Sequence, residues 1–442
     1  MAYIQGEARG QHTLFPSTLE ELVPADHVCR VIEAFVDKLE MEVLGFVRAE
    51  PAETGRPGYD PRDLLKLYLY GYLHQVRSSR RLEAECRRNV EVMWLLGRLV
   101  PDYKSIAEFR RMHREAVSRA GAELVRLARQ VGLVKGEWVA IDGSKFRAVS
   151  SAGAVREREA VKRYLDQLEH ADEQDEIIID PDAVAAALKK LKQDPEPEAR
   201  FMRMSDGSKK PAYNVQTAVD AENGIIVAHG VTGEANDVHS LQPMAEAAKQ
   251  ALSEPETLNV VADAGYSNGE QAEHCEQQGI LPHVPAQRGV NSQGDGQLFD
   301  RKLFIYDETT DTFRCPADQT LTRQQVQWGR KRIVYAAKAS ACASCPLKSK
   351  CTTCRYRRVN VHLHDAALTR MNQRATSDAM RLRRCIVERP FAVLKHLILG
   401  NARFLLRGLA GAKIEIGWAT LAYNLKTMIN VLGAHKLAAA LS

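Results

Sequence analysis

The sequence lacks any apolar run that approaches the roughly 20 residues needed to cross a membrane. Its first residues, MAYIQGEARGQ, are polar and do not form the hydrophobic centre of a secretory signal. Internal repeats are also absent. These absences argue against a membrane-spanning, secreted or repeat protein, and we expect a cytoplasmic one. With 442 residues and 45% apolar composition, the chain can bury a large core in two or three domains.

Disulfides are not expected either, because cysteines in a cytoplasmic chain are more typical of free thiols or metal ligands. Five of the nine cysteines lie between Cys315 and Cys354. Two C-x-x-C pairs, CASC (342–345) and CTTC (351–354), have the reach of a tetrahedral zinc site. The linker between them is short, so either Cys315 or Cys354 is the fourth ligand, and free thiols are the alternative to zinc. A four-thiolate zinc would be structural, because it leaves no open position for a substrate.

Acidic residues are scarce in one part of the chain. The net charge of +5 for the whole sequence says little about partners. From Lys348 to Arg407, however, 14 lysines and arginines stand against three acids, Asp365, Asp378 and Glu388. This local excess of positive charge predicts a polyanionic partner.

Residues 1–130 are predicted to form a helical N-terminal domain. Amphipathic stretches such as HVCRVIEAFVDKL recur through it, and Pro61 suits the first position of a helix. The segment RSSRRLEAECRR (77–88) has a serine-led helix start and many arginines. Arg77, Arg80 and Arg81 are therefore candidates for phosphate contacts, and a solvated helix face is the alternative.

From Trp138 the apolar periodicity changes from that of helices to that of strands. The sequence AENG predicts a hairpin, since Asn and Gly tolerate positive φ. Helices are expected after Asn236 or Asp237 and after Asp263. Three strands, a helix, a strand, a helix and a strand are the element order of a ribonuclease H-like α/β fold. The expected strands are 138–142, 213–220, 224–232 and 258–263, followed by a short one near ILPHVP.

We place this α/β domain at residues 136–285 and 366–442, with two insertions. Residues 150–210 are charged and partly helical, which favours a solvated arm, and FMRMS near its end is interpreted as loop. Residues 286–365 show β-type patterns and include the cysteine cluster, which predicts a separate β subdomain. Residues 408–432 are expected to form a long helix that supports the core.

Two aspartates follow apolar strands in similar contexts. Asp142 follows VAI in VAIDGSKFR, and Asp263 follows VVA in VVADAGY. Neighbouring strands that end in carboxylates bring oxygens together at one edge of a sheet, where hard divalent cations are held. Glu388, the only acid of RLRRCIVERPFAVLKH, is the candidate for a third ligand.

The segment around Glu388 is predicted to be a helix with two different faces. Basic residues share the stripe of Glu388, and apolar residues cover the opposite side. Pro390 is expected to bend this helix or to begin its second part. The basic residues of the stripe are Arg381, Arg384 and Lys395. Three other aspartates are interpreted as turn formers or helix caps: Asp206, Asp220 and Asp237.

Asp-Gly-Ser after a strand, YNVQTAVD, ADAGY and R-x-x-x-E-x-x-x-x-x-x-K together resemble the DDE transposases of bacterial insertion sequences, in the branch with a β region inserted before the glutamate. The resemblance implies that Asp142, Asp263 and Glu388 are the catalytic triad. It also implies that Arg384 and Lys395 hold transposon-end DNA, and Arg381 stands where the family usually has a tyrosine. For zinc, the resemblance favours four cysteines: Cys315, Cys342, Cys345 and Cys351.

The resemblance implies a DNA transposase that uses two Mg²⁺ or Mn²⁺ ions. Water cuts the transposon end, and the freed 3′-hydroxyl then attacks target DNA. The expected partners are double-stranded DNA, both transposon ends and target, and a second copy of the chain, with the protein at the nucleoid. The alternatives are a nuclease of the same fold that does not join strands, and a non-catalytic DNA-binding protein derived from a transposase.

Overall fold

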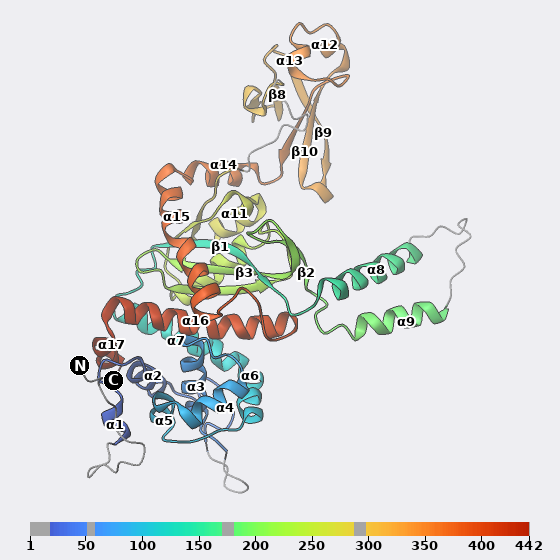
Figure 1. Ribbon diagram of the computed structural model, residues 1–442. Coiled ribbons are helices and arrows are strands. Elements are labelled where there is room, and N and C mark those ends of the chain that lie inside the picture. The colour runs from blue at the N-terminus through green and yellow to red at the C-terminus, as the bar shows by residue number, and fades with distance from the viewer. Residues whose placement is uncertain (1–17, 51–57, 170–180, 287–297, 442) are drawn as a thin grey trace, which may run out of the picture.

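Figure 1 shows the computed structural model, which describes residues 18–50, 58–169, 181–286 and 298–441. The polar N-terminal stretch, the middle of the first insertion and the start of the second lie outside these ranges. N-terminal helices lie on one side of a mixed sheet, and a β subdomain projects at the opposite end of the molecule (Figure 1). A pair of helices projects sideways from the level of the sheet.

The N-terminal region is helical, as predicted. Asp60 caps α3 by accepting a hydrogen bond from the Arg62 amide, and Pro61 occupies the first helical position, where its missing N–H costs little. Asp102 caps α6 in the same way. The helices are α1 (Leu19–Leu22), α2 (Val28–Asp37), α3 (Pro61–Leu73), α4 (Ser79–Arg88), α5 (Val90–Leu95), α6 (Tyr103–Met112) and α7 (Arg114–Gln130).

The main sheet has the order β4-β3-β1-β5-β6, and β2 pairs with the beginning of β3. β4, β3 and β1 are antiparallel, whereas β1, β5 and β6 are parallel. The parallel strands need helical connections, which α10 (Leu241–Ala251) and α11 (Gly269–Gln277) provide. The strands are β1 (Trp138–Arg147), β2 (Arg200–Arg203), β3 (Lys209–Asp220), β4 (Ile226–Thr232), β5 (Leu258–Val261) and β6 (Ile280–His283). The predicted hairpin between β3 and β4 is confirmed, with Gly224 at a φ of 74°.

Two strand predictions differ from the structure. The strand that begins at Trp138 does not end at Asp142, because its pairing with β3 continues to Arg147 after its pairing with β5 has stopped at Ala140. Asp142 therefore lies on a continuing strand that has lost its neighbour on one side. The FMRMS segment is not a loop, since its first residues belong to β2 and Met202 is buried.

The first insertion forms the lateral arm of Figure 1, composed of α8 (Ala152–Glu169) and α9 (Pro181–Lys192). Its base is fixed by two buried charged residues, Arg158 and Glu196. Arg158 donates to the Glu196 carbonyl and to the Asp194 carboxylate. The Glu196 carboxylate accepts from the amide of Gly408, which belongs to the C-terminal part of the chain. The arm is thus attached to the main body at both of its ends.

The second insertion forms an antiparallel sheet with a small core of its own. The core is apolar and separate from the main core, and it includes Phe304, Phe313, Leu321, Tyr335 and Val359. Short helices α12 (Ala339–Ala343) and α13 (Lys348–Cys351) follow the fourth strand. The strands are β7 (Ile305–Asp307), β8 (Thr312–Arg314), β9 (Thr320–Gln327), β10 (Arg332–Ala337) and β11 (Arg358–His362).

The C-terminal helices join the sheet to the N-terminal helices. Along α16 (Gly408–Leu432), Trp418 packs against the rings of Tyr68 and Tyr72 at centroid distances of 4.8 Å and 6.0 Å. On the sheet side, Asn424 of α16 exchanges hydrogen bonds with the backbone of Ile226 in β4. A single hydrophobic core therefore extends across the boundary near residue 130. The other C-terminal helices are α14 (Asp365–Arg374), α15 (Ser377–Ala392), a π-helical turn η4 (Val393–Ile398) and α17 (Ala434–Leu441).

A buried ion pair crosses this core. Arg77, just before α4, is 6% exposed and donates to the fully buried Glu415 carboxylate of α16 at 2.8 Å. Glu415 also accepts from the amides of Leu405 and Leu406. This burial gives Arg77 no access to a phosphate, so its interpretation as a DNA contact is wrong. Arg80 and Arg81, on the exposed face of α4, remain available.

We predict that Arg77→Ala destabilises the main core. The substitution leaves the Glu415 carboxylate buried without its cation, which costs about 3 to 5 kcal/mol of unfolding free energy. Urea unfolding followed by tryptophan fluorescence measures the loss, because Trp418 lies in this core. The control is Arg80→Ala, an exposed arginine three residues away, which should change stability by less than about 0.5 kcal/mol. Equal stability of both variants would contradict the structural role of Arg77.

Candidate active site

The two predicted aspartates meet at one edge of the main sheet. Asp142 lies on β1, and Asp263 directly follows the neighbouring parallel strand β5, where it caps the short helix η1 (Ala264–Tyr266). A single guanidinium nitrogen of Arg383 donates to both carboxylates, at 2.8 Å to Asp142 and 3.4 Å to Asp263. This edge follows the carboxyl ends of the parallel strands, where α/β sheets hold their ligands.

Arg383 was missed by the sequence reasoning, which placed only the exposed stripe of α15 at the site. It lies four residues before the buried Val387, so it belongs to the face of α15 that packs against β1. Its side chain is 16% exposed. A charge on the buried face of an amphipathic helix requires a partner of opposite charge, and that signal was present in the sequence.

Burial changes the protonation of Asp142. Loss of solvent raises the pKa of this carboxyl, Arg383 lowers it and the charge of Asp263 raises it, and the net pKa is about 6. At neutral pH the group is therefore mostly ionised, but at a cost in stability. A positive charge between the two carboxylates lowers this cost, and Arg383 supplies it in the structure.

Lys395 reaches the same edge from the end of the Glu388 helix. Pro390 does not interrupt α15, which continues through it and widens into the π-helical turn η4. From this turn the Lys395 ammonium donates to the Ser144 hydroxyl of β1 at 2.6 Å and lies over the ring of Phe146. Burial lowers the pKa of Lys395, whereas the charge of nearby Asp142 opposes that shift.

Glu388 lies on α15 between Arg383 and Lys395, with its side chain exposed. It has no hydrogen bond or ion pair with any residue that the structure describes. Arg381 and Arg384 are exposed on the same helix, as the stripe predicts. Ile386, Val387 and other apolar residues are buried on the opposite side, as expected. The solvent-exposed side of this helix thus carries Glu388 among several arginines.

The interpretation of Asp237 as a helix cap is wrong, because Ser240 stands at the N-cap position of α10. The Asp237 carboxylate instead reaches the sheet. Its Oδ1 accepts hydrogen bonds from the side-chain amides of Asn214 and Gln216, at 2.6 Å and 2.7 Å. It also accepts from the Lys145 ammonium at 3.5 Å. Asp206 and Asp220 do form turns, as predicted: the former accepts from the Ser208 amide, the latter from the Glu222 amide.

The glycines of both aspartate motifs adjoin Asp237. A Cβ on Gly143 would lie 2.7 Å from Asp237 Oδ1 and would also meet the Gln216 amide. A Cβ on Gly265 would lie 4.0 Å from Asp237 Oδ2. Glycine follows Asp142 because a third carboxylate approaches the backbone there.

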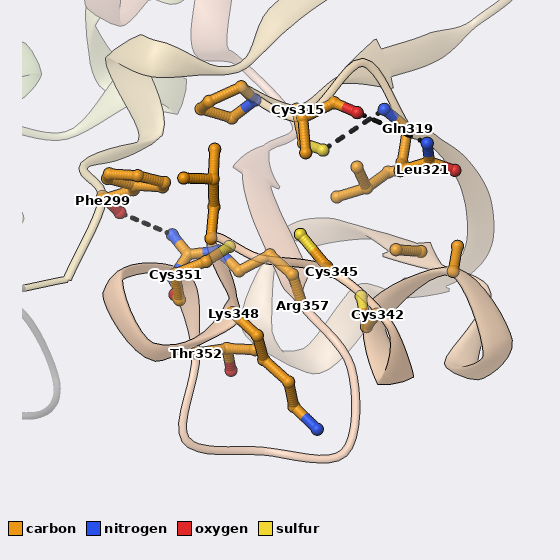
Figure 2. Close-up of a pocket in the computed structure, with 15 residues that line it drawn as sticks. Phe299, Cys315, Gln319, Leu321, Cys342, Cys345, Lys348, Cys351, Thr352 and Arg357 are labelled. Atoms are coloured by element: carbon orange, nitrogen blue, oxygen red, sulfur yellow. Dashed lines mark hydrogen bonds between the residues drawn. The ribbon is translucent and has the colours of Figure 1, made fainter.

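The cysteine cluster encloses a small cavity in the β subdomain (Figure 2). Four thiols line it, and Cys354, which is exposed, does not. Cys315 Sγ accepts a hydrogen bond from the Gln319 amide, and Arg357 holds the opposite wall by donating to the carbonyls of Cys351 and Phe299. The thiols that line the cavity are Cys315, Cys342, Cys345 and Cys351.

Each implied metal can be compared with the residues present. Thiolates suit zinc, and carboxylate oxygens suit Mg²⁺ or Mn²⁺. Among the described residues, however, neither the four thiols nor the acids contain three ligand atoms that all lie within 4.8 Å of one another. Both sets fit by donor chemistry. The four thiols share one cavity, and two of the acids share Arg383. Both sets must contract to bind an ion. At the acids, Arg383 must also move away.

One other group does lie within that distance: His27, Cys29 and Glu91 in the N-terminal helices. The His27 Nδ1 accepts from the Cys29 amide, so the ring proton is on Nε2, which faces the Glu91 carboxylate at 3.4 Å. Burial raises the pKa of Cys29 to about 12. A protonated nitrogen and a protonated thiol are poor ligands, and the group is better described as a cap of α2.

Comparison with known proteins identifies the family of the chain. Residues 139–425 match the model of the transposase DDE domain, and residues 17–112 match that of a transposase domain (DUF772). The first match covers more than half of the chain, from β1 into α16. The chain therefore belongs to the DDE transposases of insertion sequences and is a DNA transposase.

Solved structures add little to the family assignment. A piggyBac transposase synaptic complex with hairpin DNA is similar over 94% of this chain and 79% of that chain, at 8% identity and a TM-score of 0.32. At that score the likeness carries no argument. No curated protein matches the sequence. None of the helices in the described ranges is long and apolar enough to cross a membrane.

We predict that Asp142→Asn becomes more stabilising as pH rises. The pKa of Asp142 is about 6 in the folded chain, against an ordinary value of 3.8. Below pH 4 the carboxyl is protonated in both the folded and the unfolded chain. As pH rises to 6 the unfolded chain loses this proton first, so the free energy of unfolding of the wild type decreases. The amide does not ionise, so the variant gains on the order of 2 kcal/mol relative to wild type between pH 4 and pH 7. Thermal melting without divalent metal measures this difference.

The control for Asp142→Asn is Asp206→Asn in the exposed turn before β3. The pKa of Asp206 is lowered by hydrogen bonds from Ser208, so its stabilisation is already complete above pH 4. Its effect on melting should therefore stay constant between pH 5 and pH 7. A constant effect for Asp142→Asn over the same range would contradict the assigned environment.

Proposed function

We propose that the main sheet is a ribonuclease H-like catalytic domain. Its order, with three antiparallel strands followed by two parallel ones, and its α10 and α11 connections support this assignment. We propose further that the enzyme cuts transposon ends and joins the 3′-hydroxyl to target DNA. The observation that carries the proposal is the convergence of Asp142 and Asp263 on Arg383, beside the helix that contains Glu388.

In this proposal Asp142, Asp263 and Glu388 hold two Mg²⁺ or Mn²⁺ ions. When bound, such ions activate the attacking oxygen and stabilise the leaving one in an in-line displacement. The residues of the chain bind and orient the DNA. Arg383 leaves the two aspartates and becomes available to a phosphate, and Lys395 beside Ser144 holds the backbone near Asp142.

Exposed bases extend the DNA surface away from the acids. Arg381 and Arg384 on α15 are proposed to hold transposon-end phosphates, and Arg80 and Arg81 on α4 to hold a more distant part of the same DNA. All four lack an ion pair with any described residue. Double-stranded transposon ends and target DNA are therefore the proposed partners. Two ends must be brought together, so we propose a homodimer on DNA and a cytoplasmic, nucleoid-associated location.

We predict that Glu388→Gln abolishes cleavage and leaves DNA binding intact. The substitution keeps the size and exposure of the side chain but removes a ligand charge, so cleavage of labelled transposon-end DNA in Mg²⁺ should fall at least about 100-fold. The matched control is Asp378→Asn, an exposed acid on the first turn of the same helix. It should cleave like wild type.

The alternatives are separated in the same experiment. Cleavage without joining of the labelled end into a plasmid would indicate a nuclease of the same fold. Binding that a chelator does not affect, with no cleavage by the wild type, would indicate a non-catalytic DNA-binding protein. Equal cleavage by wild type and Glu388→Gln would contradict the proposed role of Glu388 as a metal ligand.

A structural zinc ion is proposed for the β subdomain, held by the thiols of Cys315, Cys342, Cys345 and Cys351. The cavity lining supports this choice over Cys354. We predict about one zinc per purified chain, lost in Cys351→Ser and retained in Cys354→Ser. Elemental mass spectrometry measures the zinc content. Zinc loss in Cys354→Ser would contradict this ligand set.

A further inference from the structure

We propose that Asp237 is a positioning residue of the catalytic centre, which holds the Lys145 ammonium away from Asp142 and Asp263. The inference rests on the proposed function, because it concerns the metal site of the transposase. It assigns a role to an acid that belongs to none of the catalytic motifs. The evidence comes from the partners of Asp237, from the position of Lys145 and from the glycines that surround the carboxylate.

The Asp237 carboxylate is fixed from one side. Asn214 and Gln216, which donate to Oδ1, are buried residues of the central strand β3. Gln216 in turn accepts a hydrogen bond from the buried Tyr266 hydroxyl, on the short helix that follows Asp263. The Asp237 side chain is therefore held by β3 and, through Gln216, is connected to the Asp263 segment. Such a network fixes the position of a charge more firmly than a surface pair does.

Lys145 is the cation that this charge retains. It lies three residues after Asp142 on β1, and its side chain is 17% exposed. Asp142 and Asp263 both act on it electrostatically, in addition to Asp237. A flexible ammonium near two catalytic carboxylates competes with a divalent cation for them. The ion pair with Asp237, at 3.5 Å, gives Lys145 another partner close to Gly143.

The two cations near these acids, Arg383 and Lys145, thus have different carboxylate partners. Arg383 is bound to Asp142 and Asp263, and it approaches from α15, a helix that is proposed to face DNA. Phosphates can attract Arg383 away from the carboxylates, because they offer bidentate acceptors. Lys145 lies on strand β1 of the sheet, and no phosphate is proposed to draw its ammonium away from the carboxylates. Without Asp237, its nearest anionic partners would be the two catalytic aspartates.

The substitution Asp237→Asn separates charge from hydrogen bonding. An asparagine can keep its oxygen toward Asn214 and Gln216, but it cannot hold the Lys145 charge. We expect the affinity of the full-length chain for Mn²⁺ to fall about tenfold, a typical loss for a residue behind the metal ligands. The free Mn²⁺ signal in electron paramagnetic resonance measures this affinity without DNA and without turnover.

The double variant Asp237→Asn with Lys145→Met tests the mechanism. Removing the ammonium should restore wild-type Mn²⁺ affinity, a rescue that loss of folding cannot mimic. Lys145→Met alone should bind Mn²⁺ at least as well as wild type, and it keeps the test valid if Asp237→Asn does not fold. The control is Asp220→Asn at the far end of β3, where the carboxylate accepts hydrogen bonds from two backbone amides. It should leave Mn²⁺ affinity unchanged whatever its effect on melting.

Each outcome has one meaning. A wild type that binds no Mn²⁺ at the acids, with Asp142→Asn as reference, would overturn the proposed function itself. A wild type that binds, together with an unchanged Asp237→Asn, would overturn the role of Asp237 only. The same holds if affinity falls in Asp237→Asn and the double variant does not recover, or if Lys145→Met alone weakens binding.

Discussion

The contact of one arginine with two aspartates organises this molecule. Asp142 and Asp263 come from adjacent parallel strands, and burial makes the charge of Asp142 costly. Arg383 compensates that charge and, in doing so, holds α15 against the edge of the sheet. The position of Glu388 follows from this contact, because Glu388 is five residues further along the same helix. The centre is thus assembled around a cation of the protein itself, in the position that the proposed function assigns to a metal.

A second constraint links this centre to the N-terminal helices. Trp418 and Glu415 of α16 are buried against residues of the helical region, and Asn424 of the same helix is bonded to β4. The π-helical turn that contains Lys395 is tied to the same region, since Gln75 donates to the carbonyls of His396 and Leu397. The helical region is therefore hydrogen-bonded to the same turn from which Lys395 reaches β1. The β subdomain has a separate core, and ion pairs between Lys331 and Glu270 and between Arg301 and Asp365 connect it to α11 and α14.

Much of this arrangement followed from local sequence patterns. The helical N-terminal region, the hairpin at AENG, the strand before Asp263 and the two faces of α15 result from apolar periodicity and turn chemistry, which act over a few residues. The pairing of Asp142 with Asp263 also followed, because carboxyl ends of parallel strands lie at one edge by geometry. The thiols around the cavity were predictable from spacing only up to the choice between Cys315 and Cys354.

The sequence by itself determined most of the helices and strands and placed Asp142 and Asp263 on or after neighbouring strands, because these features depend on neighbours along the chain. Only the tertiary structure decided which partner each charged side chain binds. Arg77 was expected to contact DNA phosphates, but it is buried against Glu415, a residue 338 positions away. Asp237 was expected to cap a helix and instead reaches β3, while Arg383 bridges acids that are 120 and 241 positions distant. A charged side chain takes its partner from whatever the fold brings within a few ångströms, and that neighbourhood is not encoded in local spacing.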